Sequence, residues 1–157
     1  MLSVLLKKSL IELNCDRALV AKIHPFDLKD NLDTLVFSSI FEELKNTDIL
    51  SVKEYVRNIP YKVLQLEFGG DKDYIVVGNK SDKHVITLDK CLSHLNKLSC
   101  EVIVNQLLYN KNYIWGILSF QYNLCPAYIK NKDIEYKYKE LIKQYKEKIQ
   151  SAASLYE

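Results

Sequence analysis

Two apolar runs near the end of the chain, separated by a short polar break, constrain the fold more than any other feature. The runs are "CEVIVNQLLY" and "YIWGILSFQY", and Asn110, Lys111 and Asn112 separate them. Runs joined by so few residues predict an antiparallel hairpin. In the second run, alternation places Trp115 and Ile117 on one face, and the other face then carries Ile114, Leu118 and Phe120. A strand with apolar groups on both faces needs a cover on each side of its sheet.

Two amphipathic helices, one near each end of the chain, are expected to supply one of these covers. The apolar spacing predicts a helix over residues 2–13, closed by Asn14, with a stripe of Leu2, Leu6, Leu10 and Leu13. Residues 131–156 predict a longer helix that begins near Asp133. Its apolar stripe consists of Ile134, Tyr138, Leu141, Tyr145, Ile149, Ala152 and Tyr156. Both stripes can lie on the same face of the sheet.

The remaining segments complete an α+β pattern. "CDRALVAKIH" predicts a strand ended by Pro25, and "TLVFSSIFEEL" predicts a second, with Thr34, Val36, Ser38 and Ile40 on one face. Residues 46–60 are expected to form either a short helix or an irregular extended segment, and a short helix is expected over 61–68. "DYIVVG" predicts a strand, and a helix is expected over 88–98. Helices and strands mixed around a mainly antiparallel sheet predict an α+β fold in one domain over residues 1–157.

Composition narrows the class of function. A chain that is 48% hydrophobic and 27% charged has the balance of a globular protein, and no apolar run is long enough to span a membrane. The first residues favour an amphipathic helix over a signal peptide, so a cytoplasmic location is expected. Net charge is +2, and Arg17 and Arg57 are the two arginines among 22 basic residues. Such a balance does not favour nucleic-acid binding, and the lysine-rich bias is typical of an AT-rich genome.

The order of elements and four local motifs resemble the GAF domain, and more specifically the short GAF-like proteins of bacteria and their phages. The hairpin "NQLLYNKNYIWGILSFQY" looks like the last two strands of the family. "VAKIH" ends a first strand in His24, "FSSIFEEL" is a serine-containing strand that runs into glutamates, and "RNIP" at 57–60 matches a recurrent element. The resemblance implies a central antiparallel sheet with both terminal helices on one face. It implies a sensing or binding role for a small molecule or a host protein, and it names no cofactor.

Ligand-binding residues follow from the same motifs: His24, Ser38, Glu42 and Asn58. The alternative for His24 is a hydrogen bond that caps its own strand, and the alternative for Glu42 is a solvated strand edge. Pro25 and Phe26 stand where the subgroup usually has Asn-Gly, the Asn-Lys-x-Phe-Asp-Glu set of cyclic-nucleotide-binding members has no match, and no cysteine matches a bilin attachment point. A pocket is expected over the face opposite the helices, beneath residues 24–68.

Catalytic and metal sites find little support. The four cysteines, at 15, 91, 100 and 125, show no C-x-x-C spacing, and no metal-binding histidine motif occurs. One alternative is a thiol-dependent reductase of the free methionine sulfoxide type, for which Cys91 and Cys100 are the candidates. Ser38 and Ser39 have no base nearby in sequence. The expectation is therefore a chain without catalytic residues and without a metal site.

The last helix carries two further expectations. Tyr136, Tyr138 and Tyr145 lie among lysines, so a nucleic-acid-associated protein is an alternative in which tyrosines stack on bases. Glutamates interleave with these lysines, and a solvated helix face is favoured instead. GAF domains often dimerise through terminal helices, so the resemblance implies a homodimer interface at Tyr145, Ile149, Ala152 and Tyr156.

Gly116 is expected to relieve crowding where a cover approaches the strand.

Overall fold

The structure is a computed structural model that describes residues 1–24, 35–54, 56–60, 74–78, 102–111, 113–124 and 132–153. The predicted helices over 61–68 and 88–98 lie outside these residues. The described elements are α1 (Leu2–Leu13), β1 (Arg17–His24), β2 (Val36–Leu44), β3 (Ile59–Pro60), β4 (Tyr74–Gly78), β5 (Val102–Asn110), β6 (Tyr113–Tyr122) and α5 (Lys132–Ala153). The α+β prediction is confirmed, as are both terminal helices and the hairpin.

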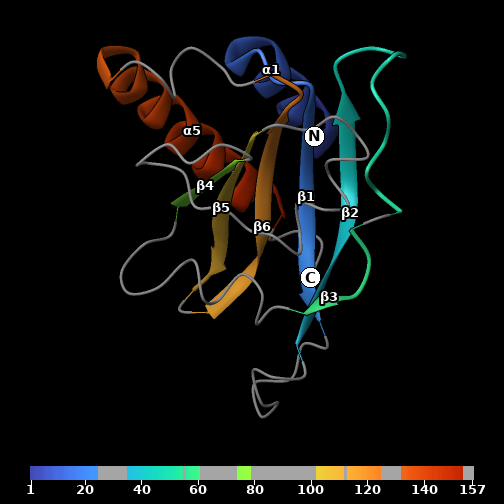
Figure 1. Cartoon of the computed structure of the whole chain (residues 1–157). Helices are drawn as coiled ribbons and strands as arrows, with labels where there is room; N and C mark the ends of the chain where they lie inside the picture. The colour runs from blue at the N-terminus through green and yellow to red at the C-terminus, as the bar shows by residue number, and fades with distance from the viewer. Residues whose placement is uncertain are drawn as a thin grey trace.

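The strands of the described residues form one sheet in the order β3-β2-β1-β6-β5-β4 (Figure 1). Each neighbouring pair is antiparallel. The central strand β1 pairs with β2 on one side and with β6 on the other, so the first strand of the chain lies against the last. The hairpin β5–β6 turns through Lys111, a non-glycine residue with a positive φ of 54°. The sheet therefore brings residues about a hundred positions apart into register.

Helix α1 is held to the sheet by its leucine stripe and by its C-terminus. Leu2, Leu6, Leu10 and Leu13 are all buried, as their spacing predicts. Asn14 ends the helix in the left-handed conformation with φ 51°, a conformation that asparagine tolerates better than most residues. The hydroxyl of Tyr122, at the end of β6, donates to the carbonyl of Leu13 at 3.0 Å. This bond satisfies one of the backbone carbonyls that a helix end leaves unpaired.

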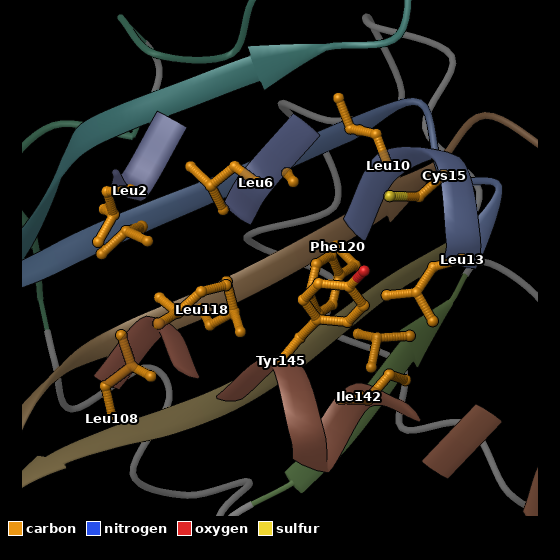
Figure 2. Packing of buried hydrophobic residues seen from close by; sticks show 14 of the residues in the cluster. Leu2, Leu6, Leu10, Leu13, Cys15, Leu108, Leu118, Phe120, Ile142 and Tyr145 are labelled. Carbon is orange, nitrogen blue, oxygen red and sulfur yellow. The ribbon is translucent and has the colours of Figure 1, made fainter. Parts of the chain in front are cut away.

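Helix α5 packs beside α1 on the same face of the sheet, which we call the helix face. Tyr145, Ile149 and Ala152 are buried there together with Ile142, which the predicted stripe did not include. Figure 2 shows leucines of α1, Leu108, Leu118 and Phe120 of the sheet, and Ile142 and Tyr145 of α5 meeting in one cluster. The amphipathic stripes at both ends of the chain therefore build one core.

Two β-bulges change which side chains face the helices. Ile40 is the extra residue of β2 between the pairs Val20–Phe41 and Ala21–Ser39, and Ile40 and Phe41 both pack on the helix-face cluster. In β6, Trp115 is the extra residue between Gly116 and Ile114, and it is buried in the helix-face cluster with Leu118 and Phe120. A bulge shifts the alternation by one residue. The predicted facing of Trp115 with Ile117 is therefore wrong, and Ile114 and Ile117 share the opposite face.

The opposite face, which we call the far face, carries a second apolar cluster. Its members from the strands include Leu19, Ala21, Ile23, Phe37, Ile103, Leu107 and Ile117. Val52 and Val56, from the segment between β2 and β3, and Ile59, the first residue of β3, pack onto this cluster. Within the described residues, this segment is what covers the far face, and it covers the end near β1 and β2. The middle segment, beneath which the pocket was expected, therefore covers part of this face through Val52, Val56 and Ile59.

Candidate functional site

Three of the four predicted ligand residues form one hydrogen-bonded network. His24 ends β1, Ser38 lies on β2, and Asn58 immediately precedes β3. Ser38 Oγ lies 3.0 Å from His24 Nε2 and accepts a hydrogen bond from the backbone N–H of Asn58 at 2.8 Å. The Ser38 hydroxyl also donates to Asn58 Oδ1 at 3.4 Å. The cross-strand pairing thus brings His24 to Ser38, although 14 positions separate them in the sequence.

The network ties the edge of the sheet together. Asn58 has a positive φ of 52°, and the N–H that it presents to Ser38 is the last before the two-residue strand β3. The backbone N–H of Ser39 donates to the carbonyl of Val56 at 2.8 Å, which fixes the same segment from the other side. Because Phe37 faces the far cluster, its neighbour Ser38 faces the side of the helices. The network therefore lies on the helix face, whereas the pocket was expected on the far face.

Glu42, the fourth predicted ligand residue, is separated from the other three by the bulge at Ile40. Its Oε2 accepts the backbone N–H of Val52 at 2.8 Å, and its Oε1 accepts the hydroxyl of Ser51. Val52 belongs to the far-face cluster, so Glu42 faces that side. The carboxylate thus has two partners within the chain and holds the segment that covers the far face.

Arg17 holds the same segment from β1. It is 1% exposed, and its Nε donates to the carbonyl of Leu50 at 2.6 Å. One terminal nitrogen, Nη1, donates to Oδ1 of Asn123 at 2.8 Å. A guanidinium is rarely buried unless hydrogen bonds compensate for its lost hydration. Arg17 and Glu42 therefore tie residues 50–52 to the sheet through two charged side chains.

Beside Arg17, the far face carries three more buried polar side chains. Arg17 pairs with Gln121 across β1 and β6, and Asn105 pairs with Ser119 across β5 and β6. Asn105 is 8% exposed, Ser119 4% and Gln121 3%. Leu118 and Phe120 alternate with Ser119 and Gln121 and face the helices, so Ser119 and Gln121 face the far side. We call Arg17, Asn105, Ser119 and Gln121 the polar cluster.

Gln121 is one of three described residues with a buried side-chain atom that has no hydrogen-bond partner; the other two are Ser39 and Trp115. Its Nε2 donates to Ser119 Oγ at 3.4 Å, but its Oε1 is buried and has no hydrogen-bond partner among the residues described. Leaving a buried acceptor unpaired costs about 1–3 kcal/mol. Buried polar groups without a partner are rare in native structures, and each calls for an explanation. The polar cluster on the far face therefore contains a hydrogen-bond acceptor, Gln121 Oε1, that the fold leaves unpaired.

The sequence contains a signal for this cluster. Ser119 and Gln121 are polar residues at alternating positions of an otherwise apolar run, and Asn105 interrupts "VIVNQLL" in the same way. Arg17 is one of two arginines in a lysine-rich chain. The facing of these side chains depends on the β1–β6 pairing, which no local pattern reveals.

The predicted dimer residues lie mainly in the chain's own core. Tyr145, Ile149 and Ala152 are 4%, 0% and 7% exposed, and Tyr156 lies outside the described residues. The pKa of Tyr145 is raised to about 12, first because burial disfavours the phenolate and then because Glu12 lies beside it. Tyr145 cannot stack on a nucleic-acid base from this position, and Tyr138 is partly buried against the same cluster.

The described part of the chain offers no site for thiol or metal chemistry. Cys15 is fully buried, and burial raises the pKa of its thiol, so the reactive thiolate is disfavoured. Cys91 and Cys100, the candidates for a reductase, lie outside the described residues. No group of three or more histidine, cysteine or carboxylate side chains that could hold a metal ion occurs among the residues described. None of the described helices is both long and apolar enough to cross a membrane.

Comparison with solved structures identifies the fold. The photoproduct state of a GAF domain from Synechocystis sp. PCC6803 superposes with a TM-score of 0.66 at 19% identity, over 97% of this chain and 90% of that one. The phycocyanobilin-bound GAF domain of a cyanobacterial phytochrome gives a TM-score of 0.64 at 15% identity, over 97% and 84% of the two chains. The chain therefore has a GAF-like fold, as the sequence resemblance implied.

A third structure with this fold comes from a different protein. A form of the Staphylococcus aureus protein NreA mutated in its nitrate binding site gives a TM-score of 0.52 at 15% identity, over 76% of this chain and 83% of that one. No protein-family model matches the sequence, and no curated protein matches it. At these identities the likeness concerns the fold.

Proposed function

We propose that this chain is a non-catalytic regulatory or adaptor module that binds a small ligand on the far face of its sheet. One observation carries the proposal: the polar cluster is buried on that face and includes the unpartnered acceptor Gln121 Oε1. Two of the similar solved structures support it by precedent, because one is a phycocyanobilin-bound GAF domain and the other, of NreA, has a nitrate binding site. Those ligands belong to those proteins. The ligand of this chain is inferred from its own polar cluster.

The mechanism would be binding that shifts an equilibrium between two arrangements of the cover. Arg17 belongs to the polar cluster and also donates to the carbonyl of Leu50, while Glu42 holds Ser51 and Val52. A ligand against the cluster would favour one position of residues 50–52 over another. A partner protein that contacts this segment would then sense occupancy. The lysine- and asparagine-rich composition supports a phage or mobile-element origin, with a host protein as that partner.

The His24–Ser38 pair is the observation that an enzymatic alternative would use, since a serine lies 3.0 Å from an imidazole nitrogen. Its hydrogen-bond pattern does not suit a nucleophile. The Ser38 hydroxyl is within reach of Asn58 Oδ1, and in the imidazole tautomer with its proton on Nε2, His24 donates to Ser38 and takes no proton from it. We therefore assign the pair a bracing role at the sheet edge.

Native mass spectrometry tests the proposed function. The purified protein would be incubated with a small-molecule extract of bacterial cells, and unbound material would be removed by gel filtration. The proposal predicts a complex heavier than the 18.3 kDa chain, lost in Gln121→Met. A spectrum with the bare chain alone, together with unchanged amide exchange on β6 in the extract, would contradict it.

Dimerisation is a separate prediction: a sedimentation mass near 18.3 kDa at high concentration would rule it out.

A further inference from the structure

We propose that the polar cluster recognises the edge of a carboxamide or lactam, in which an N–H donor stands beside a C=O acceptor on a small uncharged molecule. This inference rests on the proposed function and specifies the class of ligand at the same site. Three features of the cluster carry it: a free acceptor, a free donor proton, and a charged residue that the chain already uses.

The acceptor is Gln121 Oε1. The side chain is 3% exposed, and Nε2 lies 3.4 Å from Ser119 Oγ, so with this placement of the amide the oxygen is the atom left without a partner. Among the described residues no donor reaches this oxygen. A ligand N–H is the partner that this oxygen lacks, because a buried carboxamide oxygen gains little from an apolar neighbour or from another acceptor.

The donor is the hydroxyl of Ser119. Because Ser119 Oγ accepts the hydrogen bond from Gln121 Nε2, its own proton is available to a carbonyl oxygen. Gln121 Oε1 and Nε2 share one carbon atom, and Nε2 lies 3.4 Å from Ser119 Oγ, so acceptor and donor are close enough for one small edge. Asn105, directly across from Ser119, adds a second carboxamide beside this pair.

The ligand is uncharged because the cluster's charged side chain is committed to the chain. Arg17 donates from Nε to Leu50 O and from Nη1 to Asn123 Oδ1. Asn105, Ser119 and Gln121 are neutral, and a buried anion needs a charged partner that is free to pair with it. Leu19, Ile103 and Ile117 surround the cluster on the far face and suit a flat apolar body.

A matched pair of probes tests the class: 2-pyridone, which carries the lactam edge, and N-methyl-2-pyridone, which lacks the N–H. Each is titrated into the 15N-labelled full chain, and the backbone amides of Ser119 and Gln121 are followed by NMR. We expect 2-pyridone to shift these resonances and N-methyl-2-pyridone to bind roughly tenfold more weakly, since the buried acceptor then stays unpaired.

Two variants show whether binding occurs at the cluster. Gln121→Met removes the acceptor with little change in volume and is expected to abolish the 2-pyridone shifts. Gln106→Met is the matched control, because Gln106 is a buried glutamine of β5 whose position alternates with Asn105 and so faces the helices. It should leave the 2-pyridone affinity unchanged. A well-dispersed spectrum of each variant verifies that it is folded.

Several results would overturn the inference. Equal affinity for the two pyridones, or 2-pyridone binding that survives Gln121→Met, would show that Gln121 Oε1 accepts no hydrogen bond from the ligand N–H. If benzoate or nitrate shifts Ser119 and Gln121 while 2-pyridone does not, the ligand is anionic: the class is then wrong and the proposed function stands. If none of these probes and no component of the cell extract shifts the far face, both fail.

Discussion

The carbonyl oxygen of Ala21 occupies the space where a side chain on Gly116 would begin. A Cβ at residue 116 would lie 2.4 Å from that oxygen and 3.4 Å from the Ala21 carbonyl carbon. Crowding at Gly116 was expected from the sequence, but what approaches is the backbone of the neighbouring strand β1, not a cover. Gly116 lies next to the bulged Trp115, so this contact sets how closely β1 and β6 pair.

Replacing Gly116 by alanine should therefore destabilise the fold. A backbone carbonyl cannot move aside as a flexible side chain can, so β1 and β6 must separate. We expect a loss on the order of 2–3 kcal/mol in the free energy of unfolding, the size typical of overpacking. Urea denaturation followed by tryptophan fluorescence measures it. An unchanged unfolding midpoint would show that the two strands are not held this closely.

The two charged side chains that hold residues 50–52 make a second prediction. Arg17→Lys removes the planar fork that reaches both Leu50 and Asn123, and Glu42→Gln keeps the shape but removes the negative charge. Both should speed hydrogen exchange at the amides of Val52 and Val56, which donate to Glu42 and to the Val52 carbonyl. Lys53→Gln, an exposed change in the same segment, is the control. Exchange that is unaffected in both variants would contradict the role of these tethers.

Ser38→Ala tests the bracing role of the network at His24. The variant removes the oxygen that accepts from the Asn58 N–H, and we expect a loss of about 1 kcal/mol, with faster exchange at Asn58 and Ser39. The wild-type chain should not react with a fluorophosphonate probe. Labelling that disappears in Ser38→Ala would instead support a nucleophilic serine and the enzymatic alternative.

Tyr145 predicts a pH dependence of stability. Its pKa is about 12 in the folded chain and about 10 when unfolded, so the unfolded state loses this proton first. The contribution is complete below pH 10 and is lost as the pH rises from 10 through 12, by about 3 kcal/mol at most. In Tyr145→Phe, which lacks the phenol proton, the free energy of unfolding should fall less between pH 10 and 12 than it does in the wild type. A parallel fall in both proteins would show that Tyr145 titrates normally.

The terminal helices and the hairpin could be predicted because their signals are local. The leucine stripe of α1 and the Asn14 cap follow from spacing and residue type alone. The facing of Trp115 could not be predicted, because the bulge arises from how β6 pairs with β5 and leaves no mark in the alternation. The bulge at Ile40 likewise separates Glu42 from Ser38, although both had been assigned to one site.

The site itself depended on pairings that are distant in sequence. Arg17 meets Gln121 because β1 lies beside β6, and Asn105 meets Ser119 through the hairpin. Local patterns located the strands but not their order, so the polar residues on them could not be assembled into one cluster. The need for a cover on both faces of the sheet pointed to the far face in general and did not identify these side chains.

The stability of Gln121→Met tests most directly whether the polar cluster serves binding or folding. If Gln121 is kept for a ligand, replacing its unpaired acceptor by an apolar side chain of similar size should leave the free energy of unfolding in urea equal to wild type or higher. If the cluster is part of the structural core, the same variant should lose about 2 kcal/mol or more. That loss would contradict a binding role for the far face.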